Sequence, residues 1–189
     1  MIANQLFNRI SLFFYKNTTL WLVGLFLILL LLMLISLPLF ENILQIEENM
    51  ISLDVPPTYS SDRVYEILTE WGKDGRLKQF WLHLTWDLLF PMIYFFFLGF
   101  LLSWFSKRGF KRDSKMQKLN LVSFVAAVDL LENIALFLLI IFFPANVYIL
   151  SWIKTGLTLT KYYIFGPAIL FGLVVSTFFA SKNRFIIQD

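Results

Sequence analysis

Four long apolar runs dominate this chain and limit what it can fold into. They extend over residues 18–40, 80–105, 119–143 and 151–180. At a rise of about 1.5 Å per residue, each run is long enough, as a helix, to cross a hydrocarbon core about 30 Å thick. Hydrophobic residues make up 58 % of the 189 residues and charged residues only 15 %, a balance typical of membrane proteins. The sequence therefore predicts an all-α, polytopic membrane protein: a four-helix transmembrane bundle that forms a single membrane domain, residues 1–189.

The lysines and arginines predict the orientation of these spans. Ten of the sixteen lie in the amino-terminal segment, in the loop 106–118 or in the carboxyl-terminal tail. Such basic segments stay on the cytoplasmic side, so we expect both termini inside the cell and a multi-pass protein of the inner (plasma) membrane. The segment 41–79, with eight acids and four bases, then forms an outer loop. The ten basic residues are Arg9, Lys16, Lys107, Arg108, Lys111, Arg112, Lys115, Lys118, Lys182 and Arg184.

Several kinds of chemistry are excluded or disfavoured by composition. The chain has no cysteine, which excludes a disulfide, a thiolate metal site and a cysteine nucleophile. It has no phosphate-binding glycine loop and no histidine spacing suited to a metal, so we expect neither a cofactor nor a metal. Because the basic residues cluster beside spans, their expected partners are membrane lipids, not nucleic acid. The first run lacks a small-x-small cleavage pattern and is expected to remain as an anchor.

The outer loop contains the pattern of a short amphipathic helix. One of Ser60, Ser61 and Asp62 can cap it, and Gly72 is placed to end it before a tight polar turn at 73–76. Between them, four apolar residues recur at helical spacing. Two interpretations are open: a lid or gate over a polar interior, or a connector that rests on the bilayer surface. The apolar stripe consists of Val64, Ile67, Leu68 and Trp71.

Polar residues inside the second, third and fourth runs are the candidate site. An ionisable group at mid-bilayer costs about 2.5–3.5 kcal/mol on insertion scales, so such groups must find partners, water or a ligand. Their spacing puts them on one face of each helix: steps of four, four and three around Pro91 in the second run, and i, i+3, i+4 in the third. The candidates for binding a ligand or proton are His83, Asp87, Tyr94, Asp129, Glu132, Asn133 and Lys161, and no catalytic role is assigned to any of them.

Charge counting gives the sharpest inference from these residues. A convergent cluster of Asp87, Asp129, Glu132 and Lys161 holds three carboxyls and one ammonium, so either a carboxyl keeps a proton or a bound cation completes the site. The alternative is a structural network in which Lys161 pairs with Glu132 and Asn133 joins helices by hydrogen bonds. His83, the chain's only histidine, is either a proton relay beside Asp87 or an interfacial side chain, and Lys154 is expected near the outer boundary.

Two resemblances follow from sequence motifs. The motifs WGKDGR at 71–76, DLLFPMIY at 87–94 and DLLEN at 129–133 resemble those of a bacterial family of small four-span integral membrane proteins without an established activity. The acid before a proline in the second span and the acids in the third also resemble the emopamil-binding-protein superfamily of sterol isomerases and lipid-binding relatives. That second resemblance implies that Asp87 and Glu132 correspond to the family's intramembrane acids, which protonate or stabilise a cationic centre.

Three functions remain open at this point. The first is binding or moving a lipid-like amphiphile or a cation, with intramembrane carboxyls that take up a proton or a positive charge. The second is an intramembrane isomerase-type enzyme acting on a lipid or isoprenoid, in which Asp87 or Glu132 moves a proton. The third is a structural or assembly protein, whose polar residues only fix helix packing. The sequence sets neither the ligand nor the oligomeric state.

Overall fold

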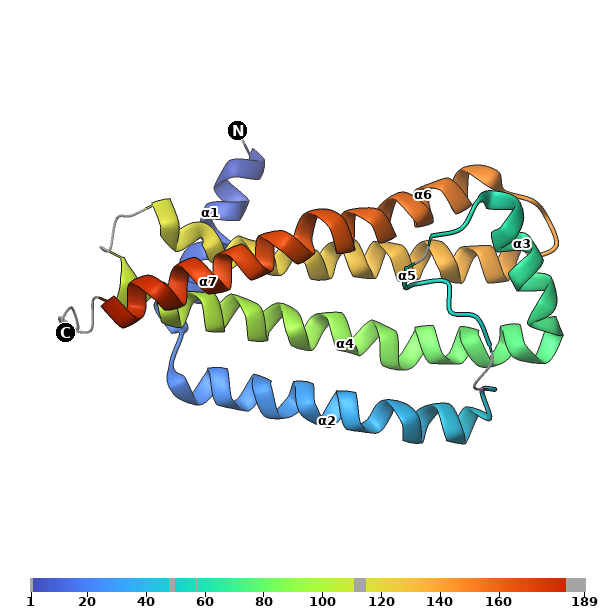
Figure 1. The fold of residues 1–189 in the computed structure, drawn as a ribbon, viewed down its shortest axis with the longest axis horizontal. Coiled ribbons are helices and arrows are strands. Elements are labelled where there is room, and N and C mark those ends of the chain that lie inside the picture. Colours follow the sequence, from blue (N-terminus) through green and yellow to red (C-terminus); the bar gives the residue numbers. More distant parts are fainter. Residues whose placement is uncertain (1, 48–49, 57, 111–114, 183–189) are drawn as a thin grey trace. The chain divides into compact units, whose positions relative to one another are not determined.

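The protein is described by a computed structural model that covers residues 2–47, 50–56, 58–110 and 115–182. Helices joined by loops make up these residues, with no strand among them, so the all-α prediction is confirmed (Figure 1). The elements, in chain order, are α1 (Ile2–Asn17), α2 (Leu20–Leu44), α3 (Ser61–Glu70), α4 (Gly72–Gly109), η1 (Lys115–Phe124), α5 (Val125–Phe142), α6 (Tyr148–Leu159), η2 (Thr160–Phe165) and α7 (Gly166–Lys182).

Four helical stretches are long and apolar enough to cross a membrane, which confirms the prediction of a polytopic membrane protein. They are Leu20–Leu44, Gly72–Gly109, Lys115–Phe142 and Tyr148–Lys182, and each contains most of one predicted run. The second begins eight residues earlier than expected.

The predicted polar turn at 73–76 is wrong. Gly72, at φ +63°, changes the direction of the chain in a single residue, and α4 begins there. The next four residues contain no proline, and Gly75 continues the helix where it packs closely against Met50 and Trp71. Asp74, in the first turn, interacts favourably with the positive end of the helix dipole.

Helix α1 was not predicted, because it is short and precedes the first apolar run. Its Phe14 is fully buried among aromatic rings, and Thr18 donates a hydrogen bond to the carbonyl of Phe100 at 2.9 Å. Asn120 of η1 donates to the carbonyl of Ser11 at 3.0 Å and to the hydroxyl of Ser103 at 2.8 Å, which ties α1, α4 and η1 together. The rings that surround Phe14 are Phe95, Phe96 and Phe100.

The chain divides into two compact units, and the long helices pass from one unit into the other. Unit 1 comprises residues 1–30, 93–125 and 165–189, and unit 2 comprises residues 31–92 and 126–164. Unit 1 contains the aromatic cluster around Phe14. Unit 2 contains α3, the loop before it and the intramembrane charges of α4, α5, α6 and η2.

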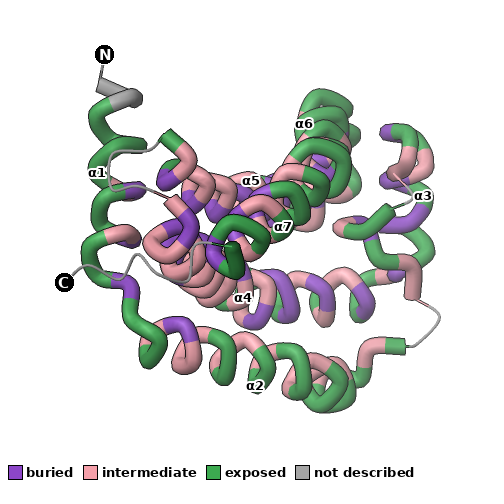
Figure 2. Tube along the Cα trace, turned by 60° about the vertical axis from the view of Figure 1, so that its left-hand side comes forward, coloured by how far each residue is buried: buried purple, intermediate pink, exposed green. Residues whose placement is uncertain are grey.

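Helix α3 forms as predicted, but its apolar stripe packs against the protein, which differs from the interpretation of a connector resting on the bilayer surface. The Ser60 hydroxyl accepts the backbone N–H of Arg63 at 3.3 Å, which confirms a serine cap. The predicted stripe, Val64, Ile67, Leu68 and Trp71, is buried in the protein (Figure 2). The stripe packs against Leu136 and Leu139 of α5. These apolar side chains therefore contact protein and are not the surface on which α3 could rest on the bilayer.

The close approach of α1 to α4 gives a first prediction. A Cβ at Gly99 would lie 2.4 Å from the ring of Phe14, which the neighbouring phenylalanines hold in place. We expect Gly99→Ala to destabilise the protein by about 1–3 kcal/mol, the usual cost of overpacking. The midpoint of thermal unfolding in detergent, followed by tryptophan fluorescence, measures it. Gly24→Ala is the matched control, because no atom lies within 4 Å of the added carbon. Equal midpoints for the two variants would contradict this packing.

Candidate functional site

Four charged side chains meet inside unit 2, and we call them the buried charge cluster: Asp129, Glu132, Lys154 and Lys161. Glu132 has no exposed surface, and its carboxylate forms ion pairs with two lysines and a hydrogen bond with one hydroxyl. Lys161 Nζ lies 2.7 Å from one of its carboxylate oxygens. Lys154 Nζ lies 3.5 Å from the other oxygen, to which the Thr158 hydroxyl also donates at 2.5 Å. Lys161 Nζ lies 2.7 Å from Asp129 as well.

Helical spacing brings the cluster together. Asp129 and Glu132 are three residues apart on α5, so both project from one face. Lys154 and Thr158 are one turn apart on α6, and Lys161 follows in η2, a π-helical turn over Thr160–Phe165. Such wide turns are rare and occur often at functional sites. Lys161 Nζ donates hydrogen bonds to Asp129 and, at 3.3 Å, to the backbone carbonyl of Asp54, and it forms an ion pair with Glu132.

Lys154 changes the charge count. Its side chain is only 2 % exposed and contacts Glu132, a contact that the sequence analysis did not predict. The cluster therefore holds two carboxylates and two ammoniums, which balance when all four are ionised. The predicted excess of three acids over one lysine is wrong for this cluster, because Lys154 joins it and Asp87 has another partner. The cluster needs neither a proton nor a bound cation to be neutral.

Asp87 forms a separate pair with His83, one turn earlier on α4. Its backbone is held by α5, since Asn133 Nδ2 donates to the Asp87 carbonyl at 2.8 Å. Pro91 explains this bond: a proline has no N–H, so the carbonyl four residues before it loses its helical partner. Asn133 supplies the missing donor, as expected of a polar residue that joins helices.

Asp54 is a site residue that the sequence analysis missed. It lies in the loop between α2 and α3, where the Ser52 hydroxyl donates to its carboxylate. Burial alone would raise the pKa of Asp54, but the positive charges of protonated His83 and of Lys161, together with the Ser52 hydroxyl, hold it below its ordinary value of 3.8. Asp54 is therefore ionised at neutral pH. Asp54 lies outside the apolar runs, and nothing in the sequence distinguishes it from the other acids of its loop.

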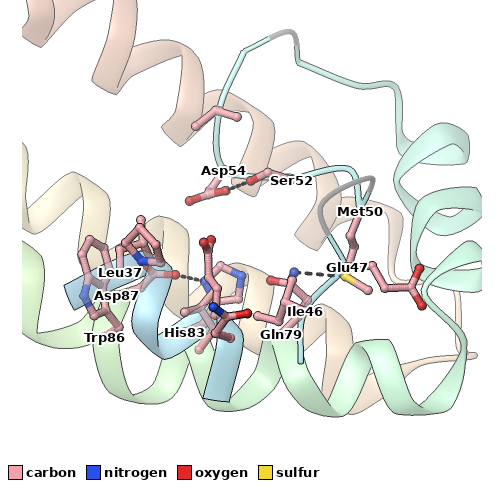
Figure 3. A pocket seen from close by; sticks show the side chains of 15 residues that line it. Leu37, Ile46, Glu47, Met50, Ser52, Asp54, Gln79, His83, Trp86 and Asp87 are labelled. Carbon is pink, nitrogen blue, oxygen red and sulfur yellow. Dashed lines mark hydrogen bonds and ion pairs between the residues drawn. The ribbon is translucent and has the colours of Figure 1, made fainter. Parts of the chain in front are cut away.

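A cavity of about 560 Å³ lies in unit 2, beside His83 and Asp87 (Figure 3). The wall comes from the end of α2, the loop that carries Asp54 and residues 79–87 of α4. It includes a single ionisable base, His83, whose side chain is 4 % exposed. The carboxylates that line the cavity are Glu41, Glu47, Asp54 and Asp87.

Trp86 gives the cavity a fixed aromatic wall. Its indole N–H donates to the Met33 carbonyl at 3.2 Å and to the Ser36 hydroxyl at 3.3 Å, both on α2. Its ring stacks on Phe90, with the ring centroids 4.7 Å apart. These contacts hold the indole in one orientation beside Asp87, while the rest of the wall mixes apolar side chains with the acids.

The structure divides the predicted candidates between two places. Asp129, Glu132 and Lys161 belong to the buried charge cluster, whereas His83 and Asp87 line the cavity. Asn133 connects α5 to Asp87, and Tyr94 belongs to unit 1. Within the described ranges, no group of three or more histidine, aspartate or glutamate side chains is arranged to hold a metal ion.

Comparison with known proteins gives no match: no family model, no curated protein and no solved structure matches the chain. The two resemblances drawn from the motifs at 71–76, 87–94 and 129–133 therefore stay predictions. Any functional argument has to come from the geometry of unit 2.

The cluster gives a second prediction. In Glu132→Gln, Lys154 stays buried without its carboxylate, and removing one partner of a buried ion pair costs about 3–5 kcal/mol. We expect a large fall in the thermal midpoint of the detergent-solubilised protein. Glu66→Gln is the matched control, because Glu66 is 62 % exposed and its pairing with Arg63 is on the surface. If Glu132→Gln unfolded at the same temperature as Glu66→Gln, the ion pairs at Glu132 would not stabilise the protein.

Proposed function

We propose that the protein binds an amphiphilic organic cation in the cavity of unit 2. The observation that carries this proposal is the unbalanced charge of the cavity wall. Glu41, Glu47, Asp54 and Asp87 line the cavity together with one base, His83, so acids exceed bases even when His83 is protonated. The buried charge cluster, by contrast, is balanced within itself. A positive ligand would supply the charge that the wall lacks, and the focused negative potential would attract it.

The apolar part of the wall suits the rest of such a ligand. Leu37, Ile46, Met50 and Leu82 contribute aliphatic surface, and an aromatic face such as that of Trp86 attracts organic cations. The volume of about 560 Å³ falls within the usual range of small-molecule sites, which are mostly apolar with a few placed polar groups. A ligand with a cationic head and a short hydrocarbon part satisfies both halves of the wall.

Charge distribution along the helices supports an orientation with both termini in the cytoplasm. Helix α4 ends in Lys107 and Arg108, and α7 ends in Lys182, whereas the cavity acids lie at the end of α2, in the loop after it and in the first half of α4. Under the positive-inside rule, the basic helix ends are cytoplasmic. The cavity then belongs to the outer halves of α2 and α4, where it receives a cation from outside the cell or from the outer leaflet.

Binding of decyltrimethylammonium tests this function. Its charge is fixed at all pH values, and isothermal titration calorimetry with the protein in phosphatidylcholine nanodiscs measures its affinity against empty nanodiscs. We expect saturable binding at pH 7.5 that Asp54→Asn weakens about tenfold or more, which corresponds to about 1.4 kcal/mol. Asp54 is the best position because its side chain lines the cavity from a loop and not from a membrane span.

Two controls make the result specific. Asp74→Asn removes an exposed acid of α4 that does not line the cavity, and should bind as the wild type does. Decanol, which has the same chain without the charge, should show no saturable binding. Equal binding of decanol and decyltrimethylammonium, or an Asp54→Asn variant with unchanged affinity, would overturn the proposal.

A further inference from the structure

We infer that His83 exchanges its proton for the bound cation, so that the cavity couples uptake of an organic cation to release of one proton. This inference rests on the proposed function and adds a property that a simple cation site does not have. It assigns to the chain's only histidine the role of an internal cation that occupies the site when the ligand is absent.

The position of His83 supports this role. Its side chain is 4 % exposed, lines the cavity and pairs through Nδ1 with Asp87 on its own helix (Figure 3). The charged groups of other elements that act on it are the carboxylate of Asp54, in the loop before α3, and the ammonium of Lys154, on α6. Glu41 and Glu47, from α2 and the residues after it, line the same cavity. A protonated imidazole therefore offsets one of the negative charges that a cationic ligand would contact.

Competition follows from these shared carboxylates. An imidazolium and an organic cation in one partly desolvated cavity repel each other, and each is stabilised by Asp54 and Asp87. Binding of either cation therefore weakens binding of the other by the same factor, as thermodynamic linkage requires. Histidine is the side chain whose charge ordinarily changes between pH 5 and 8, which suits it to such an exchange.

The exchange balances in atoms and charge. One N–H bond of the imidazolium breaks, and the proton passes to water or buffer, while the electron pair of that bond stays on the ring nitrogen as its lone pair. One positive charge enters with the ligand and one leaves as the proton, so the net charge of the cavity is unchanged. No covalent bond to the ligand forms, and no oxidant or reductant takes part.

The single histidine allows a site-specific test. Protein purified through a histidine-free tag and labelled with ring ¹⁵N-histidine gives the imidazole signal of His83 alone, which we would titrate from pH 5.5 to 8 in nanodiscs. Addition of decyltrimethylammonium should move the titration midpoint of His83 to lower pH. In parallel, calorimetry in two buffers of different ionisation enthalpy should show release of up to one proton per bound cation. At pH values below the midpoint, the affinity for decyltrimethylammonium should rise by up to about tenfold for each unit by which the pH is raised.

His83→Gln provides the variant for comparison, because glutamine keeps a donor for Asp87 but does not titrate. We expect it to bind decyltrimethylammonium with no proton release and no dependence of affinity on pH over this range. If it does not fold, the wild-type titration still decides. Saturable binding with an unshifted His83 midpoint and no released proton would overturn the inference and leave the cation site intact. Absence of binding at every pH would overturn the proposed function and this inference together.

Discussion

The structure of unit 2 depends on the neutralisation of Glu132, a carboxylate without any exposed surface. Burial of an isolated charge in an apolar setting costs far more free energy than a small protein can supply. Lys154 and Lys161 approach it from α6 and η2, and Thr158 adds a hydrogen bond. The partnership fixes the register of α5 against α6, because a shift of one residue on either helix would separate carboxylate from ammonium.

The same cluster positions the cavity. Lys161 also donates to the backbone carbonyl of Asp54, so the loop that forms part of the cavity wall is tied to the buried charge cluster. On the other side, Asn133 of α5 holds the carbonyl that Pro91 releases at Asp87. The backbones of Asp54 and Asp87, the two acids next to His83, are thus held by residues of the membrane-spanning helices. The balanced charges of the buried charge cluster fix the positions of these segments, and the unbalanced carboxylates line the cavity.

Depth and spacing were enough to predict much of this arrangement. The four apolar runs predicted the spans, a serine cap and a four-residue stripe predicted α3, and the i, i+3 spacing of Asp129 and Glu132 predicted one acidic face. The pairing of Lys154 with Glu132 could not be predicted from sequence, since a long side chain near the end of a run can extend to the interface or turn inward. Asp54 was missed because loop geometry depends on tertiary contacts, here the ammonium of Lys161.

A double-mutant cycle between Glu132 and Lys154 tests the central claim most directly. Free energies of unfolding would be measured for Glu132→Gln, Lys154→Met and the double variant in the same detergent. If Lys154 neutralises Glu132, the double variant should lose about 0.5–3 kcal/mol less stability than the summed losses of the two single variants. The reason is that the double variant leaves neither charge of this pair buried without its partner. Additive losses, within about 0.5 kcal/mol, would mean that the two side chains are not coupled and would contradict the account.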